Sequence, residues 1–147
     1  MPLPARLETA LTTGTPAEIL DATLAHFDCQ AGTVHFLEGS VLILAAHANL
    51  PPPVVALIAT VPIGKGLAGL AAERLAPVSL CNLQTDTSGQ ARPAAKTTGM
   101  EGSLAVPMLR GDTLRGVLGI AKAGAHDWTD AEKSEVLAIA ARLAARF

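Results

Sequence analysis

The N-terminal part of the sequence begins with two helical patterns. Leucines recur at intervals of four residues over residues 3–11, before a break at residues 12–15, and this spacing predicts a first amphipathic helix. Thr15 and Glu18, with a proline between them in the first turn, form a capping box that predicts the start of a second helix. The apolar face of this second helix is expected at Leu20, Leu24 and Phe27.

The C-terminal residues carry a third helical pattern. Thr129 and Glu132 form another capping box. The apolar face of the predicted helix consists of Val136, Ile139, Ala140, Leu143 and Phe147. Arg142 and Arg146 lie near its end, where cations interact favourably with the helix dipole.

Two hairpins are predicted between these helices, each around a two-residue turn that contains glycine. They comprise residues 32–38 with 41–47 around Gly39-Ser40, and residues 103–110 with 113–123 around Gly111-Asp112. The strand at 41–47 is apolar at successive positions, so we expect it to be covered on both sides. Pro107 predicts a bulge or a sheet edge in the second hairpin.

The middle of the chain combines short elements with a long loop. A short helix-like segment opens at the prolines of residues 51–53, a second short helix is predicted at 67–76, and a short strand at 76–80. Residues 84–102 form a long polar loop, and such loops in compact domains are usually functional or disordered. The order of elements predicts one α+β domain over residues 1–147 with a central antiparallel sheet.

The stretch "IGKGLAG" matches the G-x-G-x-x-G fingerprint of a dinucleotide-binding turn through Gly64, Gly66 and Gly69. That fingerprint requires a strand before the turn and alternating strands and helices. Pro62 interrupts the preceding segment, and the predicted sheet is antiparallel, so we do not assign dinucleotide binding.

The same turn leads into a helix, and the first N–H groups of a helix form an anion site. We therefore take Gly66, Leu67 and Ala68 as candidate ligand-binding residues. The alternative is that the glycines only form the turn and let the helix pack closely.

Three cations are candidates to complete this site. Lys65 either supplies charge to the anion or points to solvent. Arg92 and Lys96, in the long loop, either fold over the ligand as a lid or remain solvated. No metal site is predicted, because the four histidines form no i,i+4 pair and the hairpin register places His47 opposite Gly32 rather than His35.

Composition narrows the function classes. Half of the residues are apolar, with three Phe, one Trp and no Tyr, so small aliphatic side chains must fill the core. The net charge is -2 and no basic stripe is present, which argues against nucleic-acid binding. We find neither a membrane-spanning apolar run nor a signal-peptide pattern, and we expect a soluble, cytoplasmic protein without a cofactor. Cys29 and Cys81 are expected to be small buried hydrophobes.

Most of the chain resembles a GAF domain, the small-molecule-sensing module of bacterial signalling proteins. The resemblance lies in the first hairpin and in "PIGKGLAGLAAERLAPVSLCNL", "GSLAVPMLRGDTLRGVLGIAKA" and "DWTDAEKSEVLAIAARLA". It implies a profilin- or PAS-like fold, in which an antiparallel sheet carries the N- and C-terminal helices on one face and a ligand pocket on the other.

Within this family, "IGKGLAG" followed by "CNLQTDTSGQARPAAKTTG" is similar to the stand-alone nitrate-receptor GAF proteins that work beside a sensor histidine kinase. In those receptors, main-chain groups hold the anion in an apolar pocket. This property carries over only to Gly66, Leu67 and Ala68. The resemblance thus implies a non-enzymatic receptor for a small anion that reports to a kinase.

The sequence lacks the motifs of several other functions that the GAF fold has. Free methionine sulfoxide reductases have cysteines where this chain reads "GLAG" and "AAKTTGMEGSLAVP", and Cys81 does not replace them by position. A cyclic-nucleotide sensor is disfavoured because the N-K-x-F-D-E pattern is absent, and bilin attachment because neither cysteine precedes a histidine. A ligand-free assembly domain stays open.

A homodimer is also predicted. The Leu3/Leu7/Leu11 stripe and the Ile139/Leu143 face look more apolar than one side of a small sheet needs. We therefore expect two copies to associate through their terminal helices.

Overall fold

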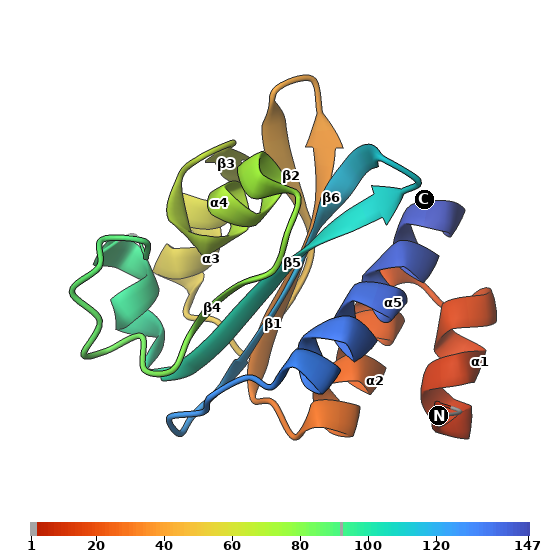
Figure 1. The fold of residues 1–147 in the computed structure, drawn as a ribbon, viewed down its shortest axis with the longest axis horizontal. Helices are drawn as coiled ribbons and strands as arrows, with labels where there is room; N and C mark the ends of the chain where they lie inside the picture. The colour runs from red at the N-terminus through yellow and green to blue at the C-terminus, as the bar shows by residue number, and fades with distance from the viewer. Residues whose placement is uncertain (1–2, 92) are drawn as a thin grey trace.

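A six-stranded antiparallel sheet forms the centre of the protein (Figure 1). The computed structural model describes residues 3–91 and 93–147, the side chains of residues 93–95 excepted. The order of strands across the sheet is β3-β2-β1-β6-β5-β4. The strands are β1 (Ala31–Glu38), β2 (Val41–Ala48), β3 (Thr60–Pro62), β4 (Val78–Leu80), β5 (Gly102–Arg110) and β6 (Thr113–Lys122). The predicted α+β fold with its two hairpins is confirmed.

Helices cover both faces of the sheet (Figure 1). One face carries α1 (Ala5–Thr13), α2 (Pro16–Phe27) and α5 (Asp130–Arg146); the other carries α3 (Pro52–Ile58), α4 (Gly66–Arg74) and a 3-10 helix, η1 (Pro93–Thr98). The predicted helices are confirmed, whereas η1 lies in a segment for which only a loop is predicted. None of the described helices is long and apolar enough to cross a membrane.

Both predicted capping boxes fix the starts of helices. The Glu18 N–H donates to Thr15 Oγ1 at 3.2 Å, and the Thr15 N–H donates back to Glu18 Oε1 at 3.0 Å. At α5, Glu132 and Thr129 make the same reciprocal pair at 3.1 and 2.9 Å. Both helices therefore begin at the residues that the sequence indicates.

The face covered by α1, α2 and α5 is filled with large apolar side chains. Nine of them are at most 1% exposed: Leu7, Leu11, Ile19, Leu20, Leu104, Met108, Leu118, Ile139 and Leu143. The terminal helices thus bury their leucine and isoleucine faces within one chain. Four of the five residues on which the dimer prediction rests are therefore buried within the chain, whereas Leu3 is half-buried, and dimerisation itself stays a prediction.

The end of α5 differs from the prediction in two ways. Phe147 is 37% exposed and does not belong to the buried face of the helix. Arg142 bonds Glu8 of α1 at 2.7 Å, and Arg146 donates to the carbonyls of Ala10 and Leu11. Both arginines therefore tie α5 to α1: Arg142 pairs with the Glu8 carboxylate, and Arg146 supplies a donor to carbonyls at the end of α1.

The first hairpin contains a β-bulge that its sequence does not reveal. The register changes between Val34 and His35, so His47 pairs with Thr33 and not with Gly32 as predicted. The expectation that β2 is covered on both sides is also wrong, because Ala45 and His47 are exposed. The neighbouring strand β3 reaches only the first three residues of β2. In the second hairpin, the bulge suggested by Pro107 is confirmed, one residue further on at Met108/Leu109.

Candidate functional site

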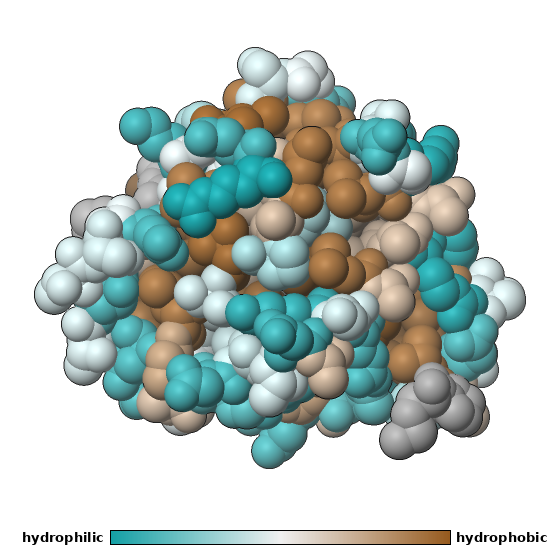
Figure 2. Space-filling model, in the orientation of Figure 1, coloured by the Kyte–Doolittle hydropathy of each residue, from teal (hydrophilic) through white to brown (hydrophobic). Residues whose placement is uncertain are grey.

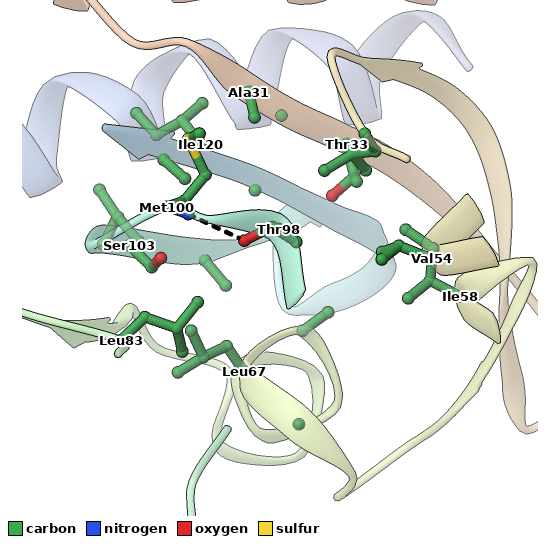
Figure 3. A pocket seen from close by; sticks show the side chains of 18 of the residues that line it. Ala31, Thr33, Val54, Ile58, Leu67, Leu83, Thr98, Met100, Ser103 and Ile120 are labelled. Carbon is green, nitrogen blue, oxygen red and sulfur yellow. Dashed lines mark hydrogen bonds between the residues drawn. The ribbon is translucent and has the colours of Figure 1, made fainter. Parts of the chain in front are cut away.

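A cavity of about 170 Å³ lies between the sheet and the helices of its second face (Figure 3). Its floor consists of small residues on three adjacent strands: Ala31, Ala105, Gly119 and Ala121. The register places Gly119 between Thr33 and Ala105, and Ala121 between Ala31 and Ser103. Larger side chains at these positions would fill the space, as they do on the opposite face, because protein interiors are otherwise close-packed.

The roof of the cavity comes from segments that are distant in the sequence. Figure 3 shows Val54 and Ile58 of α3 on one side of the cavity, and Leu67 of α4 with Leu83 on the other. α3 also contacts η1. Leu57 lines the cavity and is 54% exposed, so the cavity opens to solvent beside it.

The start of α4 brings three of the predicted site residues to this cavity. Gly66, Leu67 and Ala68 all line it. The first bond of the helix is made by Gly69 N–H to the Lys65 carbonyl at 3.1 Å, and no side chain caps the helix. The N–H groups of residues 66–68 therefore have no intrahelical acceptor, and the helix dipole gives this end about half a positive charge.

The glycines of the turn also have a structural role. Gly64 and Gly66 have positive φ values of 91° and 68°. A Cβ on Gly69 would lie 2.6 Å from the Pro62 carbonyl oxygen. Close packing of the helix thus requires glycine at position 69, which agrees with the alternative that the glycines serve the turn and the packing. Gly66, in contrast, both forms the turn and borders the cavity.

The predicted cations do not gather at the cavity. Lys65 is exposed and does not line it. Lys96 is exposed as well, and its Nζ donates to the Asp86 carbonyl at 3.0 Å. Arg92 lies outside the described residues. Among the residues that the structure describes, the cavity lining contains no charged side chain.

His35 joins the floor of the cavity to its roof. Its Nε2 lies 2.9 Å from the Ile58 carbonyl oxygen; a carbonyl only accepts, so Nε2 carries the proton. Burial lowers the pKa of His35, which favours the neutral ring. Its Nδ1 is buried and has no partner among the described residues. The side chain therefore acts as a donor that holds the end of α3 over β1.

Three hydroxyl groups also line the cavity (Figure 3). Thr33 comes from β1 and Ser103 from β5, where Ser103 is only 6% exposed. Thr98 Oγ1 accepts a hydrogen bond from the Met100 N–H at 3.1 Å. Sequence reasoning missed Thr33, His35 and Ser103 as lining residues. The available signal is the period of two in each hairpin, which places residues 31, 33 and 35 on one face.

Neither cysteine of the sequence lines the cavity. Cys29 is half-buried, and this burial raises the pKa of its thiol to about 12. Cys81 is exposed, contrary to the prediction, and a hydrogen bond with Asp127 raises the pKa of its thiol. Both thiols are therefore protonated at neutral pH, which makes them weak nucleophiles.

Comparison with known proteins gives a family and a fold. A family model described as GAF domain matches residues 15–147. A search of curated protein sequences gives no match.

Several solved structures have a similar fold. The GAF domain of a phosphoenolpyruvate-protein phosphotransferase from Acinetobacter is 18% identical with a TM-score of 0.79, over 95% of this chain and 87% of that chain. The corresponding GAF domain from Coxiella burnetii is 23% identical with a TM-score of 0.73, over 97% and 82%. Free methionine-R-sulfoxide reductase from Neisseria meningitidis, in complex with its substrate, is 16% identical with a TM-score of 0.77, over 96% and 83%. These identities indicate a shared fold and carry no statement about ligands.

Proposed function

This chain belongs to the GAF domain family, and from that premise we propose that it is a sensory domain that binds a small molecule in the cavity between the sheet and α4. The observation that carries the proposal is the uncapped start of α4 at the wall of an apolar cavity. Gly66, Leu67 and Ala68 line the cavity and their N–H groups have no side-chain cap, and such a helix start binds an acceptor or an anion.

The size of the cavity bears on which anion it holds. A cavity of about 150 Å³ lined by aliphatic and aromatic side chains holds benzene, so about 170 Å³ accommodates more than the four heavy atoms of nitrate. Nitrate can gain at most about 1.5 kcal/mol per atom, so its dissociation constant is no tighter than about tens of micromolar. We propose nitrate as the smallest ligand of the site and expect larger anions with apolar bodies to bind better.

A calorimetric titration with nitrate and with benzoate, using chloride as the control, tests the site. Ala68→Asp places a carboxylate in the first turn of α4, where it repels an anion but suits the helix dipole. Ala17→Asp is the matched control, because Ala17 is exposed in the first turn of α2, outside the cavity lining. We expect Ala68→Asp to lose binding and Ala17→Asp to retain it. Equal binding by both variants, or no heat from either anion up to millimolar concentration, contradicts the proposal.

We propose binding rather than thiol chemistry for the same cavity. The fold is shared with free methionine-R-sulfoxide reductases, but both cysteines of this chain lie outside the lining and both thiols have raised pKa values. Turnover of free methionine sulfoxide with a thiol reductant is therefore expected to be absent. Turnover that disappears in Cys81→Ser would make the protein an enzyme.

The signalling partner is a further part of the proposal. We propose that the domain reports to a sensor histidine kinase in the cytoplasm, as the resemblance of "IGKGLAG" and the following loop to nitrate receptors implies.

We also propose a homodimer, although Leu7, Leu11, Ile139 and Leu143 are buried within the chain. Light scattering at micromolar concentration, with and without nitrate, tests the dimer, and a monomer mass in both samples rejects it.

A further inference from the structure

Ser103 is a buried polar residue in the apolar wall of the cavity. It lies in β5, paired with Leu80 of β4 and with Ala121 of β6, so its backbone position is fixed on both sides. Its side chain lines the cavity and the residue is 6% exposed. Among the described residues, its hydroxyl has no hydrogen-bond partner. The hydroxyl is accessible from the cavity, so a ligand there can accept a hydrogen bond from it.

The start of α4 lies at the same end of the cavity as Ser103. Figure 3 shows Ser103 on the side of Leu67 and Leu83, opposite Val54 and Ile58. α4 also packs on β5 next to Ser103, because Ala105 belongs to the apolar cluster that contains Ala71 and Leu67. The Ser103 hydroxyl and the N–H groups of residues 66–68 are both donors and belong to residues that line one cavity, and two such donors suit an acceptor with two oxygens.

We infer that the ligand is a compact monocarboxylic acid with an apolar body, whose carboxylate binds between the Ser103 hydroxyl and the N–H groups of residues 66–68. This inference rests on the proposed function and specifies its ligand. Ser103 is thereby a specificity-determining residue of the site.

The charge of the lining limits the ligand to one negative group. No charged side chain lines the cavity among the described residues. The negative charge of a ligand is therefore compensated by the dipole of α4, which is equivalent to about half a positive charge. One carboxylate matches it. A dicarboxylate or a phosphate monoester would bury a second charge without compensation, and burying an uncompensated charge is strongly unfavourable.

The remaining space determines the body of the ligand. The other side of the cavity is formed by Val54 and Ile58 over the small residues of the floor. A volume of about 170 Å³ slightly exceeds the cavity of about 150 Å³ that holds benzene. The body is therefore an apolar group of about six carbons, and benzoate is a suitable probe.

A panel of four probes on the wild-type protein tests the inference without any substitution. The probes are benzoate, toluene as its neutral counterpart, phthalate as the dicarboxylate, and nitrate. We expect the order of affinity to be benzoate, then toluene and nitrate, with no detectable binding of phthalate. Calorimetry measures each dissociation constant at constant ionic strength.

Ser103→Ala then isolates the hydroxyl. We expect benzoate to bind about tenfold more weakly, equivalent to about 1.4 kcal/mol, because a hydrogen bond to a carboxylate is lost, while toluene binds as before. Ser79→Ala is the matched control: Ser79 lies on the adjacent strand β4, paired with Leu104, and does not line the cavity. It should leave both affinities unchanged.

The outcomes separate this inference from the proposed function. If the wild type binds benzoate no better than toluene, or if Ser103→Ala binds benzoate as the wild type does, the inference is overturned while the cavity remains a ligand site. Binding of phthalate as tight as that of benzoate overturns it equally. If none of the four probes binds, both the inference and the proposed function fail.

Discussion

The two faces of the sheet differ in packing although the same strands form both: one face is close-packed against helices, and the other lines a cavity. On the helical face, residues such as Leu104 and Leu118 interdigitate with α2 and α5 and are at most 1% exposed. On the cavity face, the neighbouring positions of the same strands are Ala105 and Gly119. Alternation along a strand thus lets one residue stabilise the fold while the next leaves room for a ligand.

The helices that cover the two faces differ in the same way. α2 and α5 have 12 and 17 residues, and a capping box starts each of them. α3 and α4 have 7 and 9 residues, and no side chain caps either of them. Stability is therefore concentrated on the helical face, while the cavity face has open backbone groups, as binding sites commonly have.

The largest expected effect comes from truncating the helical face. Leu143→Ala removes a fully buried side chain of α5 and should lower the free energy of unfolding by about 2–5 kcal/mol through lost burial and a new cavity. Urea unfolding followed by circular dichroism measures the change. A loss below about 1 kcal/mol would show that this face is less tightly packed than the burial indicates.

Filling the cavity should weaken ligand binding and leave the stability of the fold almost unchanged. Ala121→Leu adds three carbons to the floor, so we expect the binding of benzoate to fall more than tenfold while the free energy of unfolding changes by less than about 1.5 kcal/mol. Calorimetry and urea unfolding of the same sample separate the two effects. A large destabilisation with intact binding would place the ligand elsewhere.

Helix caps sharpen the comparison further. Thr129→Ala removes the cap of α5 and should cost about 1 kcal/mol of stability.

Lys65→Asp adds a cap to α4, because Lys65 has the extended backbone (φ -111°, ψ 127°) of an N-cap residue, and should stabilise the protein by about 0.5–1 kcal/mol. The new carboxylate competes for the N–H groups of residues 66–68, so anions should bind more weakly. A gain in stability without any loss of anion binding would contradict this role of the helix start.

The smallest expected effect is a pH dependence that comes from His35. Burial lowers the pKa of His35 in the folded protein, whereas the unfolded chain takes up a proton near pH 6.5. Because the unfolded state then binds more protons, stability should fall as the pH decreases below about 6.5. Glu8 and Glu18 have lowered pKa values through bonds to Arg142 and Thr15, so they act only at lower pH.

His35→Gln tests this pH dependence, because the glutamine amide can replace the Nε2 donor to the Ile58 carbonyl and does not titrate. The variant should show a flatter profile of unfolding free energy between pH 7 and 5 than the wild type does. An unchanged profile would assign the dependence to other groups.

Local signals were sufficient to predict most of the fold. The capping boxes at Thr15 and Thr129 and the turns at Gly39 and Gly111 act over a few residues, so the sequence shows them directly. The bulge at Val34/His35 could not be predicted, because it lies in the pairing of β1 with β2 and no turn or capping residue marks it. Ala45 is the residue of β2 that this bulge leaves unpaired, so its exposure could not be predicted either.

The candidate site was predictable only where one segment forms it. Gly66, Leu67 and Ala68 lie at one helix start and were predicted as a group. Ser103 and His35 reach the cavity from two hairpins, and no short pattern links serine 103 to the glycine turn. Lys65 and Lys96 are candidates because of their charge, but whether a long side chain turns inward depends on tertiary contacts, such as the bond of Lys96 to the Asp86 carbonyl.

The edges of the sheet have a consequence for the behaviour of the protein at high concentration. Both edge strands, β3 and β4, have only three residues, so neither offers a long row of free backbone groups to a second sheet. Where β5 extends beyond β4, Pro107 has no N–H to donate. Short edges and edge prolines hinder the addition of strands from other molecules. These two edge strands should therefore hinder amyloid-like addition of further strands, even though half of the residues of the protein are apolar.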